Sequence, residues 1–162
     1  MRNKWDKPHG FTLIEILVVV LIISISLGFA LLAMGDFGEQ RRLFTSAEQF
    51  VNYVTFAEHQ AIIESNTLGV RIMKSSYYLL RFQPPSHWLP MPNKSMYRIQ
   101  HFPKHTITSI ESETGSNDAP QIIVDAEGDI TPFILHLKLK GDHVTLRVVG
   151  SSDGKIKVLS TP

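Results

Sequence analysis

The chain has 162 residues, a formal net charge of +1 at pH 7 and no cysteine. A charge so close to zero argues against a protein that binds nucleic acid or another polyanion over its whole surface. Without cysteine, the chain forms no disulfide, carries no lipid on a cysteine and holds no metal through thiolates.

A short basic leader covers residues 1–10, and its charged residues are Arg2, Lys4, Lys7 and Asp6. An apolar run without proline follows over 11–34, and its polar members are Thr12, Glu15, Ser24 and Ser26. A helix of about 24 residues is about 36 Å long, which exceeds the roughly 30 Å hydrocarbon core of a bilayer. We therefore expect a transmembrane helix over 11–34, with the basic leader in the cytoplasm and residues 35–162 in the periplasm.

Glu15 is the unusual residue of the apolar run, because a charged side chain inside a membrane is costly. A central Asp, Lys or Arg costs roughly 2.5–3.5 kcal/mol, and a charge near an interface costs less. Glu15 lies about one turn from the start of the run, so its side chain can lower this cost by reaching back to the interface. Two ordinary interpretations remain open, a secretory signal peptide cut near Gly28-Phe29-Ala30 and an anchor that is never cut. A signal peptide usually has an apolar region of only about 7–15 residues, and neither interpretation explains the acid.

The junction Gly10-Phe11-Thr12-Leu13-Ile14-Glu15 resembles the class III signal of type IV pilins and type II secretion pseudopilins. The features in common are a basic leader, a glycine, a phenylalanine, an acid at mature position five and a following apolar helix. The resemblance implies that a prepilin peptidase of the inner membrane cuts after Gly10 and methylates the new amino group of Phe11. The apolar helix then stays on the mature protein.

Such a cut creates a positive charge near Glu15. Within one helix, Phe11 and Glu15 are about 6 Å apart along the axis. In a staggered bundle, the amine of one subunit can instead neutralise Glu15 of the next, and an apolar environment strengthens that attraction. Our working hypothesis is this intermolecular pairing, which makes Glu15 an assembly residue.

The remaining residues, 35–162, predict one periplasmic domain, because about 125 residues are enough for a single core. An amphipathic helix is predicted over about 39–65 by apolar residues at three- and four-residue steps. These residues are Leu43, Ala47, Phe50, Val51, Val54, Ala57 and Ala61. The polar stretch 64–67, with Gly69 just beyond it, is the stop signal.

Strand patterns follow the helix. Residues 68–73 and 77–82 predict a hairpin, and further strands are predicted at 106–110, 121–125, 133–139, 144–148 and 156–158. The proline-rich stretch 83–103 predicts an irregular loop that carries Trp88. We expect antiparallel sheet with one wet face and the helix on the other, which is an α+β, pilin-like fold.

A second resemblance lies near the C-terminus. The segment 123–133 keeps a Gly128-x-x-Thr131-Pro132-Phe133 core and, together with the helix-to-strand passage 58–72, resembles the minor pseudopilin family GspH of type II secretion. Members often have an aromatic residue near Val124 and a proline near Ala126, and both are missing here. The calcium-loop features of the major pseudopilin are not apparent.

This resemblance implies a structural subunit without enzymatic activity, cofactor, metal, nucleic acid or small-molecule substrate. The subunit would lie at or near the tip of a periplasmic pseudopilus that supports export of folded proteins across the outer membrane. Its implied partners are the other minor pseudopilins, the major pseudopilin, the prepilin peptidase and the inner membrane.

The chain also contains residue types that can bind metal ions or contact partners. Asp125, Glu127 and Asp129 alternate like oxygen ligands, but the segment lacks the spacing of an EF-hand, so a hairpin turn with solvated acids is the better interpretation. The histidines show no metal-protease spacing. In the proline-rich stretch, Trp88 and Met91 are weak candidates for partner contacts, because interfaces favour aromatic residues and methionine. Equally, they can cap the sheet.

Two rival functions remain. A type IV pilus minor pilin of the FimT/FimU kind, including forms that bind DNA during uptake, would need clustered Arg and Lys. The tail 154–162 has Lys155 and Lys157 and no arginine, which speaks against DNA binding there. A singly anchored periplasmic enzyme or sensor would keep Met1 intact.

Overall fold

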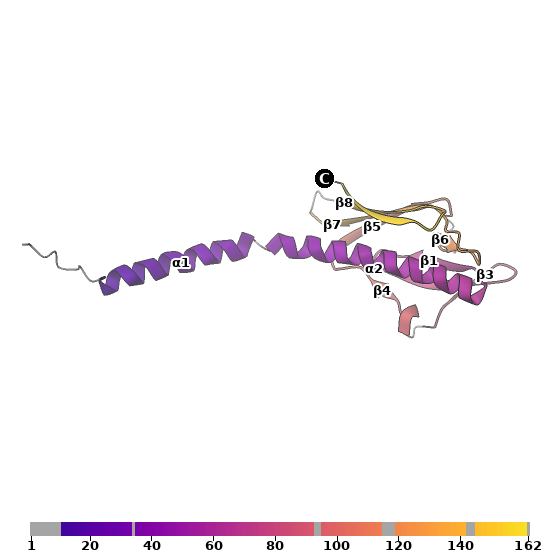
Figure 1. The fold of residues 1–162 in the computed structure, drawn as a ribbon, viewed down its shortest axis with the longest axis horizontal. Helices are drawn as coiled ribbons and strands as arrows, with labels where there is room; N and C mark the ends of the chain where they lie inside the picture. Colours follow the sequence, from indigo (N-terminus) through magenta and orange to yellow (C-terminus); the bar gives the residue numbers. More distant parts are fainter. Residues whose placement is uncertain (1–10, 34, 93–94, 115–118, 142–144, 162) are drawn as a thin grey trace, which may run out of the picture. The chain divides into compact units, whose positions relative to one another are not determined.

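The computed structural model describes residues 11–33, 35–92, 95–114, 119–141 and 145–161 (Figure 1). The chain divides into two units, Met1–Gly38 and Glu39–Pro162, and each is described by itself. Helix α1, Leu13–Ala33, belongs to the first unit. Helix α2, Gly35–Glu64, begins in the first unit and continues into the second.

Helix α1 begins at a polar cap. The carbonyl oxygen of Thr12 accepts hydrogen bonds from the amides of Glu15 at 3.0 Å and Ile16 at 3.3 Å. Thr12 is therefore the N-cap, a position that threonine favours. Beyond it, the window Leu13–Leu31 has a mean hydropathy of 2.7 and is apolar enough to cross a membrane.

Helix α2 ends in a Schellman motif. The amide of Asn66 donates to the carbonyl of Ala61 at 3.1 Å, and the amide of Ser65 donates to that of Ile62 at 3.2 Å. Ser65 takes the left-handed position of this motif, with φ 46°, which glycine usually occupies. The predicted stop at 64–67 is thus correct, although Gly69 takes no part in it.

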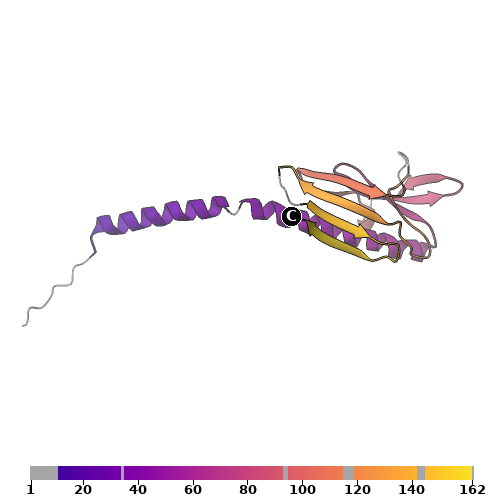
Figure 2. The same cartoon turned by 90° about the horizontal axis from the view of Figure 1, so that it is seen from above.

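The strands of the second unit form two antiparallel sheets (Figure 2). The first contains, in spatial order, β3 (His87–Pro90), β2 (Ser76–Gln83), β1 (Leu68–Ile72) and β6 (Ile122–Val124), with β4 (Gln100–His101) also paired to β2. The second contains β5 (Thr106–Ser112), β7 (Phe133–Leu139), β8 (Thr145–Gly150) and β9 (Ile156–Thr161). A 3₁₀ turn, η1, covers Ser95–Tyr97.

The α+β, pilin-like fold class is confirmed, and so is the hairpin of β1 and β2, which pair from Leu68↔Arg81 to Ile72↔Tyr77. The expectation of an irregular loop over 83–103 is wrong in part, because β3 and β4 lie within it. Proline is tolerated there since Pro90 is the last residue of an edge strand, and an edge strand leaves its outer amide positions without a ladder partner.

The core lies between α2 and the two sheets. The ring of Phe50 on α2 lies 5.0 Å, between centroids, from Tyr77 of the first sheet and 6.1 Å from Phe133 of the second. The inward residues of β7 and β8, such as Leu135 and Val148, are fully buried. All members of this core cluster fall within Glu39–Pro162, so the second unit has a complete core of its own.

Candidate assembly segment and partner surfaces

The N-terminal junction is the first candidate site. Gly10 lies outside the described residues, whereas Phe11 directly precedes the cap of α1 and is 77% exposed. Glu15 falls in the first turn of α1, three residues after the cap. An acid there interacts favourably with the positive end of the helix dipole. The helix dipole is therefore one favourable interaction for Glu15 at this position that does not depend on assembly.

Thr12 is the residue of this site that sequence reasoning missed. Thr12-Leu13-Ile14-Glu15 matches the capping-box pattern of threonine followed three residues later by glutamate. That signal is present in the sequence but is hidden by the signal motif that overlaps it. Its consequence is that the helix starts two residues after the expected cleavage point, so a new amine on Phe11 would lie at the helix entrance.

Beyond Glu15, the surface of α1 is apolar on all sides. Its two serines do not interrupt this character, because the hydroxyl of Ser24 donates to the carbonyl of Val20 at 2.7 Å and that of Ser26 donates to the carbonyl of Ile22 at 2.8 Å. Side-chain hydroxyls bonded back to the preceding turn do not need water. The helix thus suits lipid and equally a bundle of similar helices.

Trp88 packs on the outer face of the first sheet. Its ring centroid lies 5.2 Å from that of Phe82. A Cβ atom built on Gly69 would lie 2.9 Å from Cζ3 of Trp88 and 2.3 Å from Cγ of Pro120. Leu80 pairs with Gly69 across β1 and β2, so its side chain shares the face on which Trp88 lies. It is 2% exposed and lies outside the main core cluster. This geometry favours a capping role for Trp88, which stays partly exposed.

Met91 differs from Trp88. It is only 7% exposed and belongs to the main core cluster, and its amide donates to the carbonyl of Leu79 at 3.0 Å. Because the segment after β3 turns inward at this residue, Met91 has almost no surface to offer a partner. Of the two interpretations of Met91, its burial favours packing over a partner contact.

The end of α2 is tied to this same region through Glu64. Its carboxylate forms an ion pair with Arg81 of β2 and accepts hydrogen bonds from Gln60 at 2.7 Å and from the hydroxyl of Tyr97 at 3.4 Å. Partial desolvation, and secondarily the nearby Glu64, raise the pKa of Tyr97. The ring of Tyr97 also packs on Phe56 at 5.7 Å, which fixes η1 against the helix.

The acidic segment 125–129 is a structured turn. One oxygen of the Asp125 carboxylate accepts hydrogen bonds from the amides of Glu127 at 3.1 Å and Asp129 at 2.9 Å. Gly128 has φ 95°, a conformation that glycine adopts at little cost. Among the residues that the structure describes, no group of three His, Asp or Glu is arranged to hold a metal ion.

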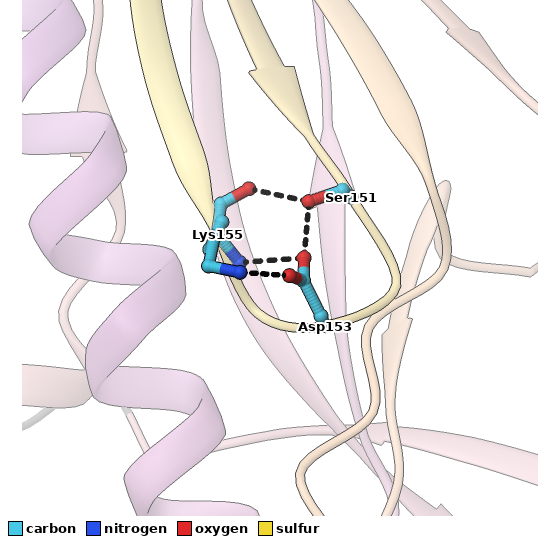
Figure 3. A network of polar contacts seen from close by, with 3 residues as sticks. All are labelled: Ser151, Asp153 and Lys155. Carbon is cyan, nitrogen blue, oxygen red and sulfur yellow. Dashed lines mark hydrogen bonds and ion pairs between the residues drawn. The ribbon is translucent and has the colours of Figure 1, made fainter.

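The β8–β9 turn is held by a small polar network (Figure 3). The hydroxyl of Ser151 lies 2.5 Å from one carboxylate oxygen of Asp153, and Nζ of Lys155 lies 2.5 Å from the other. These hydrogen bonds, from Lys155 first and then Ser151, lower the pKa of Asp153 to about 2. All three side chains serve the turn, so the network indicates structure rather than catalysis.

The comparisons with known proteins agree with this geometry. Residues 5–31 match the family described as the prokaryotic N-terminal methylation motif. A curated protein of Pseudomonas aeruginosa named type II secretion system protein H is 28% identical over 146 residues, which cover 82% of this chain and 84% of that protein.

Two solved structures show the same fold. The minor pseudopilin EpsH from the type II secretion system of Vibrio cholerae superposes with a TM-score of 0.62 at 24% identity, over 74% of this chain and 97% of its own. The type IV minor pilin FimU of Pseudomonas aeruginosa superposes with a TM-score of 0.56 at 13% identity, over 76% of this chain and 92% of its own.

Proposed function

Because the chain belongs to the GspH family of type II secretion minor pseudopilins, we propose that it acts at or near the tip of a periplasmic pseudopilus. The family is structural, and association with other pseudopilins follows from membership. The methylation motif and the apolar helix α1 are the features of a membrane-anchored subunit. The FimU-like alternative is less favoured, since both the identity and the TM-score are lower.

The proposed life history starts in the inner membrane. The basic leader stays in the cytoplasm and residues 35–162 lie in the periplasm. Prepilin peptidase cuts after Gly10 and methylates the amine of Phe11. The subunit then leaves the bilayer and joins the other minor pseudopilins and the major pseudopilin through α1.

One observation carries this proposal, namely the position of Glu15 in the first turn of an otherwise apolar helix that starts two residues after the expected cleavage point. During assembly, the carboxylate of Glu15 pairs with the Phe11 amine of a neighbouring subunit. A buried carboxylate without such a partner would be strongly destabilising. The second unit supplies surfaces for partners, and Trp88 is the candidate that we retain there.

Mass spectrometry of the protein isolated from its own bacterium tests the first step. We expect a mature N-terminus at Phe11 with one added methyl group. An intact Met1, or a cut near Ala30, would contradict the proposal and favour the anchor or the secretory-signal interpretation. Secretion of exported proteins by a deletion strain, restored by the parent chain, tests the assignment to type II secretion.

A further inference from the structure

The second unit has an uneven distribution of charge that its net value conceals. Its loops at one end carry Asp125, Glu127, Asp129 and Asp153, and these loops are neighbours because the amide of Ile130 donates to the carbonyl of Ser152 at 3.3 Å. Cations gather at the other end, where the chain arrives from α1. We call that end the anchor-side face and define it by Arg41, Arg42, Lys74, Lys104, Lys138 and Lys140.

Hydrogen bonds and strand pairing bring these lysines together. The hydroxyl of Thr108 donates to the carbonyl of Lys74 at 3.2 Å, which places the β1–β2 turn beside β5. The amide of Lys140 donates to the carbonyl of His105 at 2.9 Å, next to Lys104. Lys138 is paired with Ile107 across β5 and β7.

The two arginines come from the first turns of α2 within the second unit. In both views, these turns lie at the same end as the arrowheads of β7 and β9 (Figures 1 and 2). Arg41 and Arg42 are exposed, as are Lys74, Lys104 and Lys140. The one acid of this stretch of α2 is Glu39, so the described residues of the face carry a clear excess of positive charge.

Exposed apolar side chains accompany these cations. Met73, next to Lys74, is 54% exposed, and Ile107, opposite Lys138, is 55% exposed. Apolar side chains set among Lys and Arg are typical of surfaces that lie in a membrane interface, where cations meet lipid phosphates and apolar groups reach the acyl boundary. Protein interfaces also favour methionine and arginine. We commit to a lipid surface because Arg41 and Arg42 directly follow the segment that joins this unit to the apolar helix α1.

Covalent geometry limits how far the start of the second unit can lie from a bilayer that α1 spans. The apolar window of α1 ends at Leu31 and the second unit begins at Glu39. At no more than about 3.5 Å per residue, residues 32–38 reach at most about 25 Å, whatever angle the two units adopt. The headgroup layer occupies the first several ångströms of that distance. When α1 spans the membrane, this limit keeps Glu39, the first residue of the second unit, within reach of the headgroup region.

We propose that the anchor-side face binds the anionic phospholipid surface of the inner membrane before the subunit is extracted. This inference rests on the proposed insertion of α1 as a span. The contact holds the second unit against the bilayer and is released when the helix moves into the filament. Because juxtamembrane cations attract anionic lipid electrostatically, the contact weakens as the salt concentration rises.

Vesicle co-sedimentation of residues 39–162 tests this proposal, and the complete core of this unit permits the use of the isolated fragment. We expect binding to vesicles that contain phosphatidylglycerol and little binding to phosphatidylcholine alone. The double substitution Lys74→Ser with Lys104→Ser should weaken binding by about 30-fold, since each cation near the surface contributes about fivefold. The matched control, Lys155→Ser with Lys157→Ser, removes equal charge at the acidic end and should change binding much less.

Equal losses in the two double variants, or no binding to any anionic vesicle, would overturn the proposal. A second measurement uses the full chain in lipid nanodiscs, with an environment-sensitive fluorophore on Met73→Cys and on Glu127→Cys. We expect a blue shift at position 73 alone, and only with anionic lipid. If the anchor-side double variant kept its vesicle binding but failed to co-purify with other pseudopilins, the face would be a protein interface.

These outcomes are separable from those of the proposed function. Vesicle binding by the fragment needs neither cleavage nor a filament, so its failure leaves the pseudopilus assignment intact. Conversely, failure to restore secretion, combined with normal vesicle binding, would contradict only that assignment.

Discussion

Gly150 and Phe133 form a cross-strand pair in the second sheet, and this pair makes a quantitative prediction. A Cβ atom on Gly150 would lie 2.2 Å from Cε1 of Phe133 and 2.7 Å from Cδ1 and Cζ. Carbon atoms pack favourably at about 3.5–4.0 Å. The methyl group of Gly150→Ala therefore forces the ring of Phe133 to move by roughly 1 Å or more. Phe133 is buried against Phe50, which leaves it little room.

We expect Gly150→Ala to lower the free energy of unfolding by about 1–3 kcal/mol, the usual cost of overpacking a core. For a domain of this size, each kcal/mol corresponds to about 3–5 °C in Tm. Urea and thermal unfolding of residues 39–162 measure the effect. The backbone φ of Gly150 is not positive, because the positive-φ glycines among the described residues are Gly128, Gly141 and Gly154. Any loss of stability in Gly150→Ala therefore comes from side-chain packing and not from backbone strain.

A double-mutant cycle supplies the control. Phe133→Leu alone should destabilise by opening space, but in combination with Gly150→Ala the added methyl group should fill part of that space. The double variant should therefore be more stable than the sum of the single effects by about 1 kcal/mol. Additive effects, or a Gly150→Ala variant within about 0.5 kcal/mol of the parent, would refute the packing argument.

Three further predictions concern other parts of the second unit. Ser65→Gly should raise stability by about 0.5–1 kcal/mol in urea unfolding, because glycine relieves the left-handed position of the Schellman motif; a decrease would contradict this cap. Trp88→Ala should cost about 1–3 kcal/mol in the same assay by uncovering Leu80, whereas unchanged stability with lost partner binding would mark Trp88 as an interface residue instead. Burial raises the pKa of Tyr53 to about 12 and that of Tyr77 further, so stability should be complete below pH 10 and fall as the pH rises through about 12. Tyr77→Phe should reduce this alkaline loss, and an unchanged pH profile for that variant would contradict the assignment.

The sequence predicted the elements of this protein better than their arrangement. Alternation in 133–139 and the steps from Leu43 to Ala61 identify strand and helix because each depends on local periodicity. The division into two sheets depends on which strands pair across long separations, and no local pattern reports this. The strand β3 was missed because prolines at its borders suppress the strand signal, although they are tolerated at an edge.

The candidate sites show the same contrast. Glu15 stands out in the sequence because a carboxylate in an apolar run is conspicuous. The burial of Met91 cannot be seen there, since a methionine in a proline-rich stretch has the same pattern whether it faces the core or solvent. The anchor-side face was also invisible, because its cations come from α2, three turns and β7 and meet only in the folded unit.

Glu15→Ala tests the central claim, which is that Glu15 joins this subunit to a filament through the processed amine of a neighbour. The variant should still enter the membrane and be cut after Gly10, because neither step needs the carboxylate. The measurement is its incorporation into pseudopili sheared from cells, compared with the parent at equal expression. The account predicts normal processing with strongly reduced incorporation, and incorporation equal to that of the parent would contradict it.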